Sequence, residues 1–208
     1  MNVELTNVSL NVLYTSGPLV GSVQDEANIT NCIVDGILNG DSSSGGMIGA
    51  IRGNSTSDAS IVIQNCHTSV NVACRYRSGG FVGTIGGKGS YIDINECSST
   101  GTVTALGNSN NKVGGFLGHG DMFKLLTITN SYSTGDVSGG GYIGGFAGDL
   151  EPYTTNFTHP DFENTIANCY ATGSVTGTGS SIGGFIGGMY QGYHESCKRN
   201  LRSRWTYW

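Results

Sequence analysis

The sequence predicts a parallel β-solenoid, a rod in which successive turns of the chain stack on one another through parallel strands. Three observations predict it: a repeat of about 30–40 residues, apolar residues at fixed positions of that repeat, and 35 Gly among 208 residues. Only three residues are Pro and 37% are apolar, which is unlike a disordered linker. Gly disfavours helices and long strands, so we expect about six right-handed coils, each with three short strands joined by tight turns.

The first element of the repeat is Gly-Gly-apolar-apolar-Gly, which we expect to form one strand. Its copies are Gly45–Gly49, Gly79–Gly83, Gly114–Gly118, Gly144–Gly148 and Gly183–Gly187, with Gly17–Gly21 as a variant first copy. One position of this element gives an apolar column of Leu19, Met47, Phe81, Phe116, Phe146 and Phe185. The Gly pairs are expected where the coil turns tightly or where stacked backbones come close.

The second element reads Ile-x-Asn-Cys-x-x-x-Gly-x-Val in outline. It gives two more apolar columns: Ile29, Ile63, Ile94, Ile128 and Ile166, and Leu38, Val72, Val103, Val137 and Val175. Residues at fixed offsets with polar neighbours are what stacked strands need to share one core. A polar column precedes the Cys position: Asn31, Asn65, Glu96, Asn130 and Asn168. We expect the Asn side chains to hydrogen-bond along this column and to hold a corner of the coil.

The Cys position itself forms a ladder of Cys32, Cys66, Cys97, Ser131 and Cys169, continued by Cys197. Stacked coils hold equivalent Cα atoms near 4.8 Å apart, which lies within the roughly 4.4–6.8 Å range of disulfides. Bridges such as Cys66–Cys97 or Cys169–Cys197 therefore fit the spacing. Buried free thiols fit it too, and Ser131 favours them, because one coil loses its Cys without a matching change. The sequence has no CxxC pair, which argues against a zinc site.

The pattern GGFxG followed by I-x-N-C-Y-x-T-G-x-V-x-G resembles the GLUG-type repeat of bacterial and some eukaryotic surface proteins. The best copies are Gly114–Gly139 and Gly144–Gly177, and the resemblance extends from about Gly17 to Gly188. It implies a β-helical stalk or adhesive region of a large extracellular protein, without catalytic residues. We divide the chain into a solenoid over 1–188 and a basic, aromatic cap or tail over 189–208.

Composition and charge argue against two classes of partner, nucleic acid and the membrane interior. Charged residues make up 12% of the chain, with a net charge of −5 and no basic face, which argues against nucleic acid. No apolar run approaches the roughly 20 residues that span a bilayer, so we expect no membrane insertion. Met1 leads directly into the repeat with no signal peptide, and we expect the chain to be a fragment of a longer exported protein.

Loops of unequal length separate the two elements, and loops on a rigid scaffold commonly carry binding sites. The densest acidic patch lies around 149–164, where Asp149, Glu151, Asp161 and Glu163 accompany His159. We take these five residues as a candidate ligand-binding loop for a sugar or calcium. A carbohydrate-active site would need them to converge with His119, Asp121 or Lys88. Enzymes of this fold need two or three carboxylates, or carboxylates with Arg or Lys, on one face of adjacent coils. The acids share no column, so we expect neither catalytic residues nor a cofactor.

The sequence therefore predicts a non-catalytic structural or adhesive module of an extracellular or cell-surface protein. Its expected partners are another copy, joined end to end through open strand edges, or a surface glycan or protein. The alternative is a carbohydrate-binding or carbohydrate-active β-helix that uses the loop face around 149–164.

Overall fold

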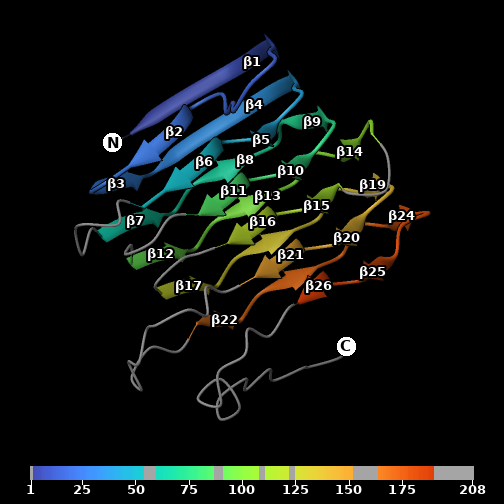
Figure 1. Cartoon of the computed structure of the whole chain (residues 1–208). Coiled ribbons are helices and arrows are strands. Elements are labelled where there is room, and N and C mark those ends of the chain that lie inside the picture. Colours follow the sequence, from blue (N-terminus) through green and yellow to red (C-terminus); the bar gives the residue numbers. More distant parts are fainter. Residues whose placement is uncertain are drawn as a thin grey trace.

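The computed structural model describes residues 2–53, 60–86, 91–107, 111–121, 125–151 and 164–189, and it shows a parallel β-solenoid (Figure 1). Every strand pair among these residues is parallel, and the strands form four sheets that run the length of the rod. The predicted fold class is thus confirmed. No helix in the described part of the chain has the length and apolar character needed to cross a membrane.

Each sheet collects the equivalent segments of successive coils. Sheet A contains β1 (Val3–Asn11), β4 (Cys32–Asn39), β8 (His67–Thr68), β9 (Asn71–Cys74), β13 (Ser98–Ser99), β14 (Val103–Ala105), β18 (Tyr132–Ser133), β19 (Val137–Gly139), β23 (Tyr170–Ala171) and β24 (Val175–Gly177). Sheet B contains β5 (Ser43–Gly45), β10 (Arg77–Gly79), β15 (Lys112–Gly114), β20 (Tyr142–Gly144) and β25 (Ser181–Gly183).

The other two sheets complete the wall of the rod. Sheet C contains β2 (Val20–Gln24), β6 (Ile48–Arg52), β11 (Val82–Gly86), β16 (Leu117–Asp121), β21 (Ala147–Glu151) and β26 (Ile186–Met189). Sheet D contains β3 (Ala27–Thr30), β7 (Ser60–Gln64), β12 (Tyr91–Asn95), β17 (Leu125–Thr129) and β22 (Thr165–Ala167). Within the described residues, sheet C has six strands but sheets B and D have five each, so the predicted count of six coils is slightly too high.

The prediction of three strands per coil is wrong. A coil such as the one from β5 to β9 has five short strands, because the Gly-Gly element contributes to two strands and the Asn-Cys corner separates two more. Gly45 ends β5, Gly46 and Met47 form a bend, and Ile48 begins β6. A Cβ on Gly45 would collide with the carbonyl oxygen of Ile48, and one on Gly46 with the carbonyl oxygen of Gly80. The Gly pair therefore permits a sharp turn from sheet B into sheet C.

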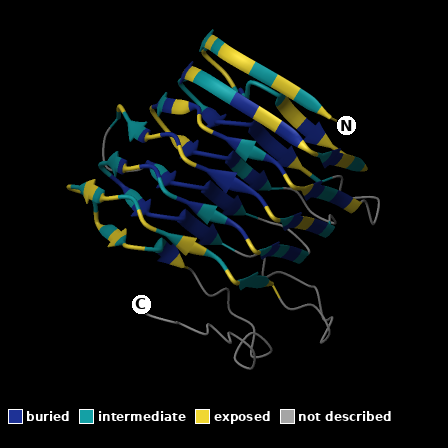
Figure 2. Ribbon diagram, turned by 180° about the vertical axis from the view of Figure 1, so that it is seen from behind, coloured by how far each residue is buried: buried dark blue, intermediate teal, exposed yellow. Residues whose placement is uncertain are grey.

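The core fills the interior of the rod, as the buried inner strand positions in Figure 2 show. The Ile column pairs in register from Ile29 through Ile63 and Ile94 to Ile128 and Ile166. The Phe column stacks face to face: ring centroids lie 4.7 Å apart for Phe81 and Phe116 and 4.8 Å apart for Phe116 and Phe146. The predicted apolar columns thus supply one continuous core.

The Asn column lies at the corner between sheets D and A. All five members have left-handed backbone, with φ between 51° and 55°. Asn tolerates this conformation better than most residues, because its short amide bonds locally. Asn65 donates to Asn31 at 2.7 Å, and Asn168 donates to Asn130 at 3.1 Å. Glu96 interrupts the ladder, and Asn130 donates to Asn95 instead, at 2.8 Å.

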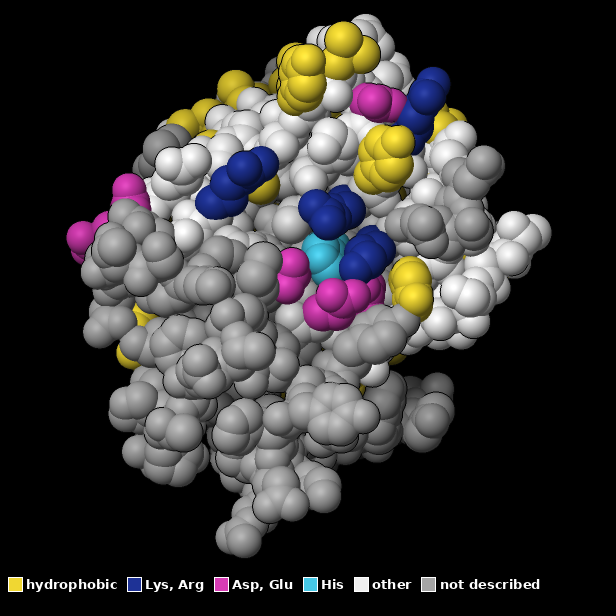
Figure 3. Space-filling view, in the orientation of Figure 1, with side chains coloured by type: hydrophobic (Ala, Val, Ile, Leu, Met, Phe, Trp, Pro, Cys, Tyr) yellow, Lys and Arg dark blue, Asp and Glu magenta, His cyan; other side chains and the backbone are white. Residues whose placement is uncertain are grey.

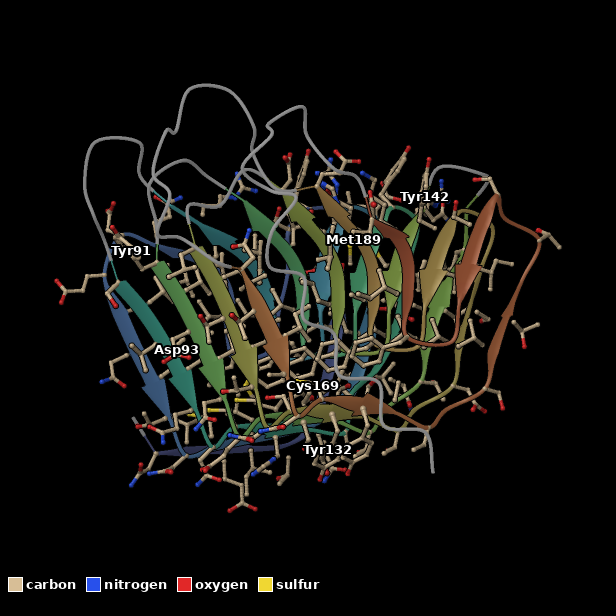
Figure 4. The ribbon with its side chains drawn as sticks, turned by 90° about the horizontal axis from the view of Figure 1, so that it is seen from below. Tyr91, Asp93, Tyr132, Tyr142, Cys169 and Met189 are labelled. Carbon is tan, nitrogen blue, oxygen red and sulfur yellow. The ribbon has the colours of Figure 1, made fainter. Side chains whose placement is uncertain are left out.

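The five described cysteines are free thiols, and four of them line the inner side of this corner. Each of these four donates to the carbonyl two residues earlier; the Sγ–O distance is 3.3 Å for Cys66 and Cys169 and 3.2 Å for Cys97. Figure 4 shows Cys169 on the inner side, with Tyr132 and Tyr142 on the outside of the rod. Cys197 lies outside the described residues, as does the predicted cap or tail beyond β26.

Candidate functional site

Two outward-facing columns of side chains meet where sheet B bends into sheet C. The column on sheet B is Ser43, Arg77, Lys112, Tyr142 and Ser181, paired in register. The column on sheet C is Ala50, Thr84, His119, Asp149 and Gly188. We call the surface between them the axial groove. Figure 3 shows the charged side chains gathered on this face of the molecule.

The geometry of β21 shows that the groove is an inside corner. Leu150 belongs to the core, whereas its neighbour Asp149 faces the other side of the strand. Asp149 is nevertheless fully buried, because Lys112 from sheet B reaches across it. The Thr84 hydroxyl of sheet C likewise donates to Ser43 Oγ of sheet B at 3.0 Å, so side chains of the two sheets meet across this corner.

Lys112 is the centre of the charged cluster. Its Nζ lies 2.6 Å from Asp149 Oδ2 and 2.9 Å from Glu151 Oε1, so one ammonium group holds two carboxylates of the next coil. Burial opposes the charge on Lys112, but hydrogen bonds to the two carboxylates outweigh it and raise its pKa. Burial raises the pKa of Asp149 to about 6, although the hydrogen bond from Lys112 acts in the opposite direction.

His119 lies beside this pair and is almost wholly buried. Burial, followed by the charges of Lys112 and Arg77, lowers its pKa to about 4, so the ring is neutral at pH 7. Its nitrogens lie 3.6 Å from Asp149 and 3.9 Å from Asp121, which is too far for hydrogen bonds. Within the described residues, His119 Nδ1 and Asp149 Oδ1 have no hydrogen-bond partner.

The structure corrects the expectation that the acids share no column. His119 pairs with Asp149, and Asp121 pairs with Glu151, on adjacent strands of sheet C. Asp149 and Glu151 of the candidate loop therefore do converge with His119 and Asp121. The other candidates, His159, Asp161 and Glu163, lie outside the described residues, and so does Lys88.

Sequence reasoning missed Arg77 and Lys112. Each comes two residues before a Gly pair, and His119 and Asp149 each come one residue after the last Gly of the element. Counting offsets from the Gly-Gly element would have aligned all four side chains. Only the apolar position of the Gly-Gly element was compared between coils, so the polar residues that flank the element were not aligned.

The innermost carboxylate of the cluster is closed off from solvent. The carboxylates of Asp149 and Glu151 both contact one ammonium group, but Asp149 has no exposed surface and cannot reach a glycosidic bond. Among the described residues, no three His, Cys, Asp or Glu side chains are arranged to hold a metal ion. The Lys112 ammonium occupies the position between the carboxylates that a cation would take.

Beside the cluster, the groove widens into a pocket of about 260 Å³. Its lining residues come from the first coils and from the cluster itself: Ser42, Ser43, Tyr76, Arg77 and Lys112. No acidic side chain of the described residues lines it. The groove is therefore polarised, with the basic pocket towards β5 and the acidic side chains of Asp121 and Glu151 towards β21.

No family model matches this chain. The chain is 28% identical over 199 residues to an immunoglobulin A1 protease of Streptococcus pneumoniae, a match that covers 92% of this chain and 9% of that protein. An immunoglobulin A1 protease of Streptococcus sanguinis is 28% identical over 148 residues, 71% of this chain and 8% of that protein. Halomucin of Haloquadratum walsbyi is 32% identical over 108 residues, half of this chain and 1% of that protein.

The chain thus spans less than a tenth of the length of each of these relatives. Likeness to so small a share of a protease does not support a catalytic role for this chain. It does show that the region similar to this chain is a small part of large proteins. The GLUG-type resemblance stays a prediction, since no family model bears on it.

Proposed function

We propose that this chain is a non-catalytic structural module of a large extracellular protein, in which it holds other parts of that protein apart or presents them. The observation that carries the proposal is the unbroken register of sheet C, whose six strands pair from β2 to β26 around one core. Such a rod is stiff along its axis, because each coil is hydrogen-bonded to the next.

Two further points support an extracellular location of the protein that contains this chain. Immunoglobulin A1 is a secreted antibody, so a protease named for it acts outside cells, and this chain is similar to a small part of two such proteins. The GLUG-type pattern is likewise one of surface proteins. A repeat module with an adhesive role fits both points.

The test is accessibility on intact cells that make the native protein. An antibody raised against the 208-residue chain should label intact cells or the culture medium, and mild surface proteolysis should remove the label. Labelling only after lysis would contradict the proposal. So would cleavage of immunoglobulin A1 or of a glycan by the purified chain alone.

End-to-end self-assembly is a second candidate, and one observation favours it. Within the described residues, β2 and β26 each have a neighbouring strand on one side only. Exposed strand edges template pairing with another chain. Light scattering and electron microscopy of the purified chain over a concentration series test this: rods of constant width that lengthen with concentration support it, and a monomer at every concentration contradicts it.

A further inference from the structure

The basic pocket of the axial groove has the size of a single-ring ligand. Pockets for drug-sized molecules occupy about 300–1,000 Å³. The volume here is about 260 Å³. Figure 3 shows Lys and Arg side chains gathered on this face of the molecule. A ligand of one ring, or one ring of a longer chain lying along the groove, matches this space.

Arg77 supplies a cation that makes no ion pair with a described carboxylate, although its charge acts on Asp121 from a distance. The other described cations are engaged: Arg52 donates to Thr15, Arg75 pairs with Asp41, and Lys112 holds its two carboxylates. Arg77 makes no such pair among the described residues, and it lines the pocket. A guanidinium group offers a planar fork of donors that matches a carboxylate in a bidentate manner.

Hydroxyl groups and an aromatic ring complete the lining. The Thr84 hydroxyl donates to Ser43 Oγ at 3.0 Å, which fixes the Ser43 hydroxyl at the pocket wall. Tyr76 is 57% exposed, although aromatic rings tend to be covered. An exposed ring with a polar tip provides a flat apolar surface for a ring-shaped partner. Few polar groups around an aromatic ring are typical of a site that orients a small ligand.

The acidic end of the groove sets the orientation of an anionic ligand. Asp121 and Glu151 lie one and two coils beyond Arg77, towards the C-terminal end of the described chain. Their charges repel an anion, so a carboxylate is favoured only at the Arg77 end. The uncharged, hydroxyl-bearing part of the ligand is then free to lie towards the acidic end, where carboxylates accept hydrogen bonds from hydroxyl groups.

We propose that this pocket binds a carboxylate-bearing sugar unit, such as a uronic acid or a sialic acid, of an acidic glycan. Arg77 holds the sugar carboxylate, the ring stacks on Tyr76, and Ser43 bonds a ring hydroxyl. This assignment goes beyond a structural role, and it moves the expected sugar site from the loop around 149–164 to the basic end of the groove.

The test is a titration of the full 208-residue chain with glucuronate and with N-acetylneuraminate, followed by NMR chemical-shift and saturation-transfer measurements. Glucose serves as the neutral sugar and acetate as the carboxylate without a ring. We expect binding of at least one acidic sugar, at least tenfold tighter than that of glucose or acetate. No binding of either acidic sugar, or acetate binding as tightly as both, would overturn the proposal.

The variants locate the site. Arg77→Ala should weaken binding at least tenfold, and Tyr76→Ala should weaken it severalfold. Arg75→Ala is the matched control: it removes the same charge from the same turn, but Arg75 pairs with Asp41 outside the pocket. Equal losses in the Arg75 and Arg77 variants would show diffuse attraction by surface charge and would refute the assignment. Thermal melting of each variant confirms that the solenoid is intact.

Discussion

Lys112 Nζ lies 2.6 Å from Asp149 Oδ2, although the carboxylate is fully buried and belongs to a different sheet and the next coil. The contact joins sheets B and C across the concave corner between them. An ion pair in this position is sensitive to the loss of one partner, because the remaining charge has no access to water.

Lys112→Met should therefore destabilise the chain by about 3 kcal/mol at pH 7, since it leaves Asp149 buried and unpaired. The double variant Lys112→Met, Asp149→Asn removes both charges and should recover most of that loss. Urea unfolding of the two variants and the parent chain measures this. A single variant within about 1 kcal/mol of the parent would show that the pair is dispensable.

His119 should contribute a pH dependence of a defined sign. Its pKa is about 4 in the folded chain and 6.5 without the fold, so the unfolded chain binds the extra proton between these values. Stability is therefore lost as the pH falls from 6.5 to 4, by at most about 3 kcal/mol. Asp149, whose pKa is raised, acts in the opposite direction between about pH 4 and 6.

The comparison of the parent chain with His119→Gln isolates this contribution, because Asp149 and the facing Lys112, Arg77, Asp121 and Glu151 remain in both. We expect the parent to lose more stability than the variant between pH 6.5 and 4 in urea unfolding. Parallel curves for the two proteins over this range would contradict the prediction.

The Phe column should be the most sensitive part of the core. Phe116 stacks between Phe81 and Phe146, and Phe116→Ala should cost about 3–5 kcal/mol, because it opens a cavity that two rings cannot fill. Tyr132→Ala is the control: it breaks a stack of 4.9 Å with Tyr170 on the outer surface and should cost no more than about 1.5 kcal/mol. Calorimetric melting separates the two, and equal losses would contradict the role of the inner stack.

Glu96 should be a position where a substitution stabilises the fold. It has φ of 55°, a conformation that costs most L-residues about 1–2 kcal/mol and Asn less. Glu96→Asn should raise stability by up to about 1 kcal/mol and restore the Asn ladder. Glu4→Asn, which removes an exposed acid from the regular strand β1, should leave the urea midpoint unchanged. An equal gain in both variants would point to net charge as the cause.

The sequence was sufficient for the solenoid, because coils of one repeat must place like residues in one column, as Ile63 over Ile29 shows. It was not sufficient for the bend inside the Gly-Gly element. Gly46 and Met47 continue an apolar run, so the run looks like one strand, and only the close approach of Gly46 to the next coil shows the turn.

The candidate site was predicted in part. Asp149 and Glu151 were expected, and they do lie in a charged cluster, but the residue that holds them was not foreseen. Lys112 looks like an isolated surface charge in the sequence. Counting from the Gly-Gly element places Lys112 in one column with Arg77. That Lys112 reaches Asp149 depends on the angle between two sheets, which this count does not give.

The stacking of the coils also has a mechanical consequence. Asn31 and Asn65 are 34 residues apart and occupy the same place on successive turns. A turn adds about 4.8 Å to the rod, yet its residues would reach about 110–120 Å when drawn straight. Because the hydrogen bonds between turns run along the rod, tension on its two ends loads the outermost strands first. A stalk of this kind acts as a rigid spacer under small forces. Under larger forces it lengthens by roughly 100 Å for each turn that unfolds.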